Sequence, residues 1–336
     1  MTAAAGAPLQ ASTPGRLRTA LANSATAPVY FVLLALFVIS GVLVTVTTGG
    51  AYFTVDVVTS ILIRAVALGL VAAGQTVVIM AGSLDLSVAY TVSVTAVMAS
   101  FIMQGQADLM GISTVAVLII GAGIGLANGL IITKLHVNPF IATLGVGLML
   151  RGVLNASFNN FAGSVPPEYQ TLGYTFLGPV PLSVILLGLV FGLGWFAMRY
   201  TRFGLHVFAV GGSEEVSRLS GVRSDRVLIG AHVICSLTAV LAGIFLVSRL
   251  RAGAPWVGTD GAYDLESIAA VVLGGTALAG GKGTIMGTLA GVLILAVLDS
   301  VFNALQITAF AKDVLRGVIL IAAVAFYVIR ERQVAR

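Results

Sequence analysis

Polar side chains interrupt the long apolar runs of this sequence, and their types suit hydrogen bonding to a neutral solute. These residues are Gln75, Asn128, Thr143, Asn155 and Asp299. The set consists mostly of amides and hydroxyls, which donate and accept hydrogen bonds without carrying charge, so it fits an uncharged polyol better than an ion. The alternative is that each one bonds a neighbouring helix, which is the commoner use of polar side chains in apolar helix bundles.

The segment Gly82-Ser-Leu-Asp-Leu-Ser87 separates two apolar runs and places an acid between them. A carboxylate in such a position is costly unless it caps a helix, meets a cation or faces water. Asp85 therefore either satisfies free N–H groups at the start of the next helix, or lines a solute path together with Ser87. Both interpretations stay open.

Enzymatic and nucleotide-binding motifs do not emerge from the remaining polar residues. The three histidines are widely separated and form no metal-binding pair or nucleophile–base set. The glycine-rich stretch 274–284 departs from the phosphate-binding loop twice, with Thr276 in place of the first glycine and Gly283 in place of Ser or Thr after Lys282. We expect a tight cytoplasmic turn there, no catalytic site, and no cofactor or metal bound by this chain.

The arginine-rich segment 199–226 contains the signals of a short capped helix. Ser213 is a good N-cap, while Glu214 and Glu215 place negative charge in the first turn. Gly221 is suited to end the helix in the left-handed conformation.

One apolar face of this predicted helix has no obvious use within the chain. Val216 and Leu219 are three residues apart and therefore share that face. A helix this short is not stable alone in water. We infer that a groove on a cytoplasmic protein partner receives it.

The composition requires a membrane around these elements. Hydrophobic residues make up 58% of the 336, charged residues make up 9%, and the mean hydropathy is +1.05. These values exclude a soluble globular domain and indicate an all-α polytopic membrane protein, with about ten spans of about 20 residues each. The predicted spans are 29–46, 61–81, 86–103, 112–132, 139–154, 181–198, 227–247, 265–279, 285–302 and 314–329. The eighth is short enough to be re-entrant.

These spans define one transmembrane domain at 29–330, between a mobile cytoplasmic tail at 1–28 and a short cytoplasmic tail at 331–336. Most of the 18 Lys and Arg residues then fall in internal loops, which places both termini in the cytoplasm. Arg249 and Arg251, in an external loop, fit this rule least well. The net charge of +5 belongs to loops facing lipid headgroups and gives no basis for nucleic-acid binding.

Four ordered motifs resemble the permease subunits of bacterial ABC importers for simple sugars, the ribose and related monosaccharide group. They are Gly82–Val88, Asn128 to Gly145 with Arg151, Ala209–Gly221, and Asp264 to Gly283. The resemblance covers about residues 60 to 330. The family usually has Gly where this chain has Ala89 and often Asn where it has Ser213.

The resemblance implies a subunit of the bacterial cytoplasmic membrane without an ATPase site of its own. It implies a cytoplasmic ABC ATPase that holds ATP and Mg, a periplasmic or lipid-anchored sugar-binding protein, and a second permease copy or paralogue. The expected ATPase-coupling residues are Gly204, Gly211, Ser213, Glu214, Glu215, Val216, Arg218, Leu219 and Gly221.

Two alternatives remain at this point. An ion-coupled secondary transporter would need a titrating acid in a span, for which Asp85 and Asp299 are the candidates. Within the ABC class, a permease for a nucleoside or a branched-chain amino acid is the other possibility.

Overall fold

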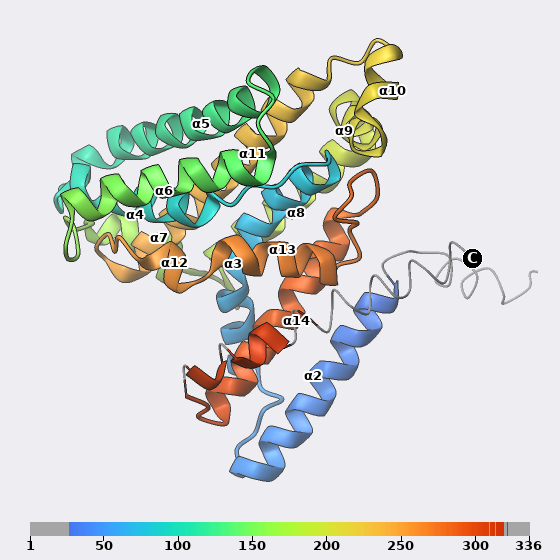
Figure 1. The fold of residues 1–336 in the computed structure, drawn as a ribbon. Coiled ribbons are helices and arrows are strands. Elements are labelled where there is room, and N and C mark those ends of the chain that lie inside the picture. Colours follow the sequence, from blue (N-terminus) through green and yellow to red (C-terminus); the bar gives the residue numbers. More distant parts are fainter. Residues whose placement is uncertain (1–26, 309, 313, 319–320, 322–336) are drawn as a thin grey trace, which may run out of the picture.

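The computed structural model describes residues 27–308, 310–312, 314–318 and 321, and this part of the chain is predominantly helical (Figure 1). The long helices are α2 (Ala27–Thr48), α3 (Val55–Met80), α5 (Met110–Lys134), α6 (Pro139–Ser157), α8 (Leu182–Tyr200), α11 (Ser224–Leu250) and α14 (Ile285–Ala304). The shorter helices are α4 (Val88–Met103), η1 (Ala107–Leu109), η2 (Pro167–Gln170), α7 (Thr171–Tyr174), α9 (Arg202–Gly212), α10 (Glu214–Leu219), α12 (Val257–Asp260) and α13 (Tyr263–Leu273). A hairpin of β1 (Phe176–Leu177) and β2 (Val180–Pro181) precedes α8.

Seven of the described helices are long and apolar enough to cross a membrane, and the prediction of about ten spans is not confirmed. The predicted spans 86–103 and 265–279 correspond to α4, with 16 residues, and α13, with 11. At about 1.5 Å per residue, α13 reaches only about half of a hydrocarbon core of about 30 Å. The predicted span 314–329 and the tails 1–28 and 331–336 lie wholly or largely outside the described residues.

The central helices are α3 and α11, which pack against each other and against most other elements. Their contact buries Leu70, Val78 and Ala239 completely. Figure 1 shows α5 and α4 beside α11, while α2 runs along α14 at the edge of the bundle.

Glycines allow α5 to approach α11 closely. Gly121, Gly125 and Gly129 form a row on α5, and a methyl group at Gly125 would meet the backbone of His232 and Val233. Rows of this kind let helix backbones come together where a larger residue would separate them. This packing places Asn128 of α5 next to α11 and the segment before α4.

The two ends of α3 and α11 face different surroundings. The start of α3 and the end of α11 lie near α12, α13 and the β1–β2 hairpin. The end of α3 and the start of α11 lie near α9 and α10. With 26 and 27 residues, these helices separate the two ends by about 40 Å at ~1.5 Å per residue.

Candidate functional site

A buried polar cluster surrounds Asp85, in the segment between α3 and α4. Asp85 Oδ2 lies 3.1 Å from His232 Nδ1 on α11, and both side chains are 0% exposed. The other ring nitrogen of His232, Nε2, lies 3.0 Å from Ser83 Oγ. The backbone N–H and the hydroxyl of Ser87 both donate to Asp85 Oδ1, at 2.9 and 2.6 Å. Asp85 therefore makes hydrogen bonds both to Ser87, which directly precedes α4, and to His232 on α11.

Two further helices reach the same cluster. Asn128 Nδ2 on α5 donates to Ser87 Oγ at 2.8 Å and lies 3.3 Å from Asp85 Oδ2. Thr143 Oγ1 on α6 accepts from the backbone N–H of Leu86 at 3.1 Å. Four of the predicted path residues, Asp85, Ser87, Asn128 and Thr143, thus lie together, and all four are fully buried. Their hydrogen bonds join the segment 82–87 to three helices.

The other predicted path residues lie elsewhere. Gln75 is buried on α3, where its Oε1 accepts from the Cys235 thiol at 3.4 Å. Asn155 is exposed near the end of α6. Asp299 lies on α14 near the opposite end of α3. The structure therefore does not bring the seven candidates into one site.

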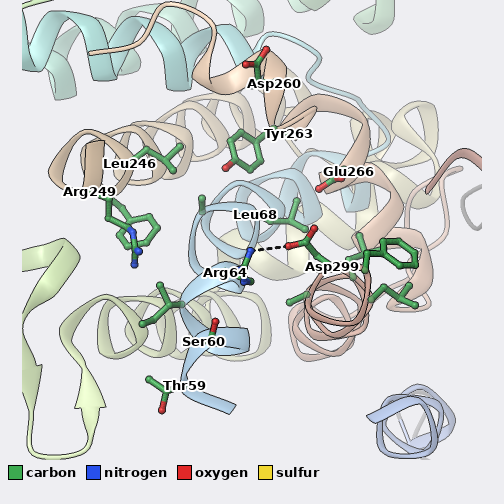
Figure 2. A pocket seen from close by; sticks show the side chains of 18 of the residues that line it. Thr59, Ser60, Arg64, Leu68, Leu246, Arg249, Asp260, Tyr263, Glu266 and Asp299 are labelled. Atoms are coloured by element: carbon green, nitrogen blue, oxygen red, sulfur yellow. Dashed lines mark hydrogen bonds and ion pairs between the residues drawn. The ribbon is translucent and has the colours of Figure 1, made fainter. Parts of the chain in front are cut away.

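Asp299 belongs to an open cavity of about 810 Å³ between α3, α11, α13 and α14, here called the Arg64 cavity (Figure 2). Arg64 Nη1 lies 3.2 Å from Asp299 Oδ2. Arg316 joins Asp299 Oδ1 at 3.0 Å to Glu266 Oε1 at 3.1 Å. This chain of ion pairs connects α3, α13 and α14 to the described part of the C-terminal segment.

The sequence interpretation did not include Arg64, Glu266 or Arg316 among the site residues. Arg64 stands within the apolar run of α3, and an ionisable residue inside a membrane span is itself a signal of function. Glu266 and Arg316 belong to regions interpreted as span starts, where charge is ordinary. Only the fold shows that they meet.

At the other end of the bundle, α9 and α10 form a surface unit, here called the docking segment (202–219). Ser213 Oγ accepts from the Val216 N–H at 3.3 Å, so the predicted N-cap is confirmed. Glu214 pairs with Arg218 one turn later at 2.9 Å, and the turn after α10 includes Gly221 with φ +83°. The cap hydrogen bond and the ion pair both stabilise a helix of only six residues.

The predicted apolar pair on α10 faces outward. Val216 is 61% exposed and Leu219 is 83% exposed. Arg218 also reaches Asp225 at the start of α11, and Asp225 in turn pairs with Lys134 at the end of α5. The pair therefore stands on a segment anchored to two long helices.

Two glycines hold α9 against its neighbours. A methyl group at Gly204 would overlap the Met198 carbonyl at the end of α8, and one at Gly211 would overlap the Met80 carbonyl at the end of α3. The Met80 carbonyl also accepts the Gly281 N–H at 3.0 Å. Gly211 thus contacts the residue from which the chain enters the Asp85 segment.

Comparison with known proteins identifies transport permeases as the relatives of this chain. Residues 57–324 match the family described as branched-chain amino acid transport system / permease component. The ribose import permease protein RbsC of Escherichia coli (strain K12) is 36% identical over 297 residues, covering 87% of this chain and 91% of that protein. RbsC of Bacillus subtilis (strain 168) is 36% identical over 78% of this chain and 82% of its own length.

The L-arabinose transport system permease protein AraH of E. coli (strain K12) is 35% identical over 77% of this chain and 78% of its own length. No solved structure matches the chain. These matches confirm the resemblance to permeases of the ribose group. The chain therefore belongs to the permease-component family of ABC transport systems and is a multi-pass protein of the inner membrane.

Proposed function

We propose that this chain is the membrane permease subunit of an ATP-driven ABC importer and forms the path for a monosaccharide or related polyol. The relatives named for ribose and L-arabinose transport support this solute class. So do the neutral amides and hydroxyls along the spans, which exchange hydrogen bonds with hydroxyl groups. The permease supplies the path, and ATP and Mg bind to the partner ATPase.

The observation that carries the coupling to an ATPase is the exposure of Val216 and Leu219 on a capped, anchored helix. Val216 and Leu219 are adjacent on one face of α10, and a contiguous exposed apolar surface of this kind suits a contact with a partner. An amphipathic helix that enters a groove is a common recognition mode. We assign the cytoplasmic side to this end of the bundle because Lys134, Arg218 and Arg226 gather there.

The contacts of α9 suggest how movement reaches the solute path. Closure of the ATPase dimer would push on α10, and α9 would transmit that push through Gly211 to the end of α3. The Asp85 cluster lies directly beyond this contact and joins α4, α5, α6 and α11. Rigid rocking of these packed helices would alternate access between the two sides of the membrane.

The assembly implied by this function has two further components. A periplasmic or lipid-anchored sugar-binding protein would deliver the solute to the end of the bundle near α12 and α13. A second permease, identical or paralogous, would complete the path. Both chain termini would lie in the cytoplasm.

An ion-coupled secondary transporter is the second candidate, favoured by the buried Asp85–His232 pair. An acid and an imidazole in hydrogen-bond contact inside a membrane protein are suited to a proton relay. The pair is closed to water on every side, however, and this function gives the docking segment no role. A nucleoside or branched-chain amino acid permease differs from the first proposal only in its solute.

Reconstitution into proteoliposomes separates these functions. The complex purified with its partners is expected to accumulate labelled D-ribose when ATP is supplied to the cytoplasmic face together with the binding protein. A protonophore should leave that accumulation unchanged. Uptake driven by a proton or sodium gradient without ATP would favour the ion-coupled carrier and contradict the proposal.

A further inference from the structure

The Arg64 cavity has the size and access of a ligand site and lies far from the docking segment. Its volume of about 810 Å³ is within the range of small-molecule pockets, about 300–1,000 Å³. Figure 2 shows Arg64, Tyr263, Glu266 and Asp299 around one side of the cavity and Arg249 across from them. The side chains of Arg64 and Asp299 are 46% and 24% exposed, so the rest of the described chain does not enclose either of them.

The charges of the lining are nearly balanced. Three arginines (Arg64, Arg249 and Arg316) face four carboxylates (Asp56, Asp260, Glu266 and Asp299). Asp299 is held between two of these arginines, and Arg316 also pairs with Glu266. With three positive and four negative groups, the lining has a formal charge close to zero and gives no strong net attraction to an ion of either sign. The balanced lining therefore favours a neutral ligand.

Donors remain available within this ion-pair chain. A guanidinium carries five N–H groups, and among the described residues Arg64 makes a single hydrogen bond, to Asp299 at 3.2 Å. Ser60 and Thr59, one turn earlier on α3, add hydroxyls to the same wall. A ligand with several hydroxyl groups would bond to these donors and acceptors simultaneously.

Aromatic side chains complete the lining. Phe245, Tyr263 and Phe176 come from α11, α13 and the β1–β2 hairpin. Aromatic rings offer broad apolar surfaces that pack against the C–H faces of a sugar ring. Guanidinium, carboxylate, hydroxyl and aromatic groups together match the mixed polar and apolar surface of a carbohydrate.

We propose that the Arg64 cavity of each chain binds an uncharged polyhydroxylated molecule the size of a monosaccharide. This inference rests on the proposed function, because the cavity opens at the end of α3 and α11 opposite the docking segment, where the imported solute would arrive. The ion-pair chain presents the donors and acceptors, and the aromatic residues hold the ring.

Saturation-transfer NMR on the full chain in lipid nanodiscs tests this site, with D-ribose, L-arabinose and L-leucine as probes. The wild-type chain is expected to give a signal for at least one sugar and none for L-leucine. Asp299→Asn should weaken sugar binding by about tenfold, since it removes a charged acceptor and the carboxylate that pairs with both Arg64 and Arg316. Asp225→Asn is the matched control, because Asp225 also bridges two cations, Lys134 and Arg218, at the other end.

A second pair of variants separates binding from the stability of the ion-pair chain. Ser60→Trp fills the cavity without removing a charge and is expected to abolish the sugar signal, whereas Ser220→Trp beside α10 should retain it. Sugar binding that survives both Asp299→Asn and Ser60→Trp would overturn the cavity site, as would a signal from L-leucine alone. A wild-type chain that co-purifies with an ATPase but binds neither sugar would overturn this site and leave the proposed function intact.

Discussion

His232 Nδ1 lies 3.1 Å from Asp85 Oδ2, and this contact joins residues 147 positions apart in a completely buried pair. Its second nitrogen is also engaged, by Ser83. The histidine therefore braces α11 against the segment that follows α3. Because the same segment begins beside Gly211, the brace lies between the docking segment and the centre of the bundle.

His232→Ala is expected to destabilise the protein by about 1–3 kcal/mol beyond the loss of packing, because the buried Asp85 carboxylate and Ser83 hydroxyl each lose one hydrogen-bond partner. Ser83→Ala removes only one of these bonds and should cost less. Thermal unfolding of the variants in the same detergent measures the difference. Equal melting temperatures for His232→Ala and the wild type would show that the pair does not hold α11 in place.

Gly211→Ala should reduce transport strongly, because the added methyl group would overlap the Met80 carbonyl and displace α9. Overpacking of this kind costs about 1–3 kcal/mol. Gly212→Ala is the matched control, since nothing lies within 4 Å of its added methyl group. Sugar uptake by membrane vesicles is the measurement, and similar loss in the two variants would refute the role of the Gly211 contact.

Leu219→Asp should abolish transport and loosen the ATPase while leaving the chain inserted, because the exposed side chain contributes little to the fold. Leu177→Asp in the β1–β2 hairpin is the control, as Leu177 is 67% exposed at the other end of the molecule. Quantitative pull-down of the ATPase compares them. Undiminished ATPase recovery with Leu219→Asp would remove the coupling role of α10.

The proposed orientation of the chain in the membrane predicts which loops a reagent added outside the cell can label. Cys235 is the only cysteine in the sequence and is fully buried, so it provides an unreactive background. A membrane-impermeant maleimide is expected to label Leu177→Cys in intact cells, or in spheroplasts where an outer membrane is present. Leu219→Cys should react only after permeabilisation. The reverse pattern would invert the proposed topology.

The sequence was sufficient for the helical class, most spans and the capped helix at Ser213, because each depends on local periodicity or on a cap. The predicted span 265–279 was longer than the helix α13, because the apolar run continues past the helix end at Leu273 into a glycine-rich turn. Apolar composition alone does not distinguish a crossing helix from a short buried one.

The site was less predictable than the fold because it depends on contacts between distant segments. Asp85 meets His232, and Arg64 meets Asp299 across 235 positions. No periodicity in the sequence encodes these pairings. Both ring nitrogens of His232 are hydrogen-bonded, to Ser83 and Asp85, and these partners come from the tertiary fold alone.

The central claim is tested most directly by purifying the tagged chain from native membranes in mild detergent and identifying the bound proteins by mass spectrometry. We predict recovery of an ABC ATPase whose hydrolysis in the complex is stimulated by a sugar-loaded binding protein. A well-folded chain that is repeatedly recovered alone, and that accumulates solute under an ion gradient, would contradict the account.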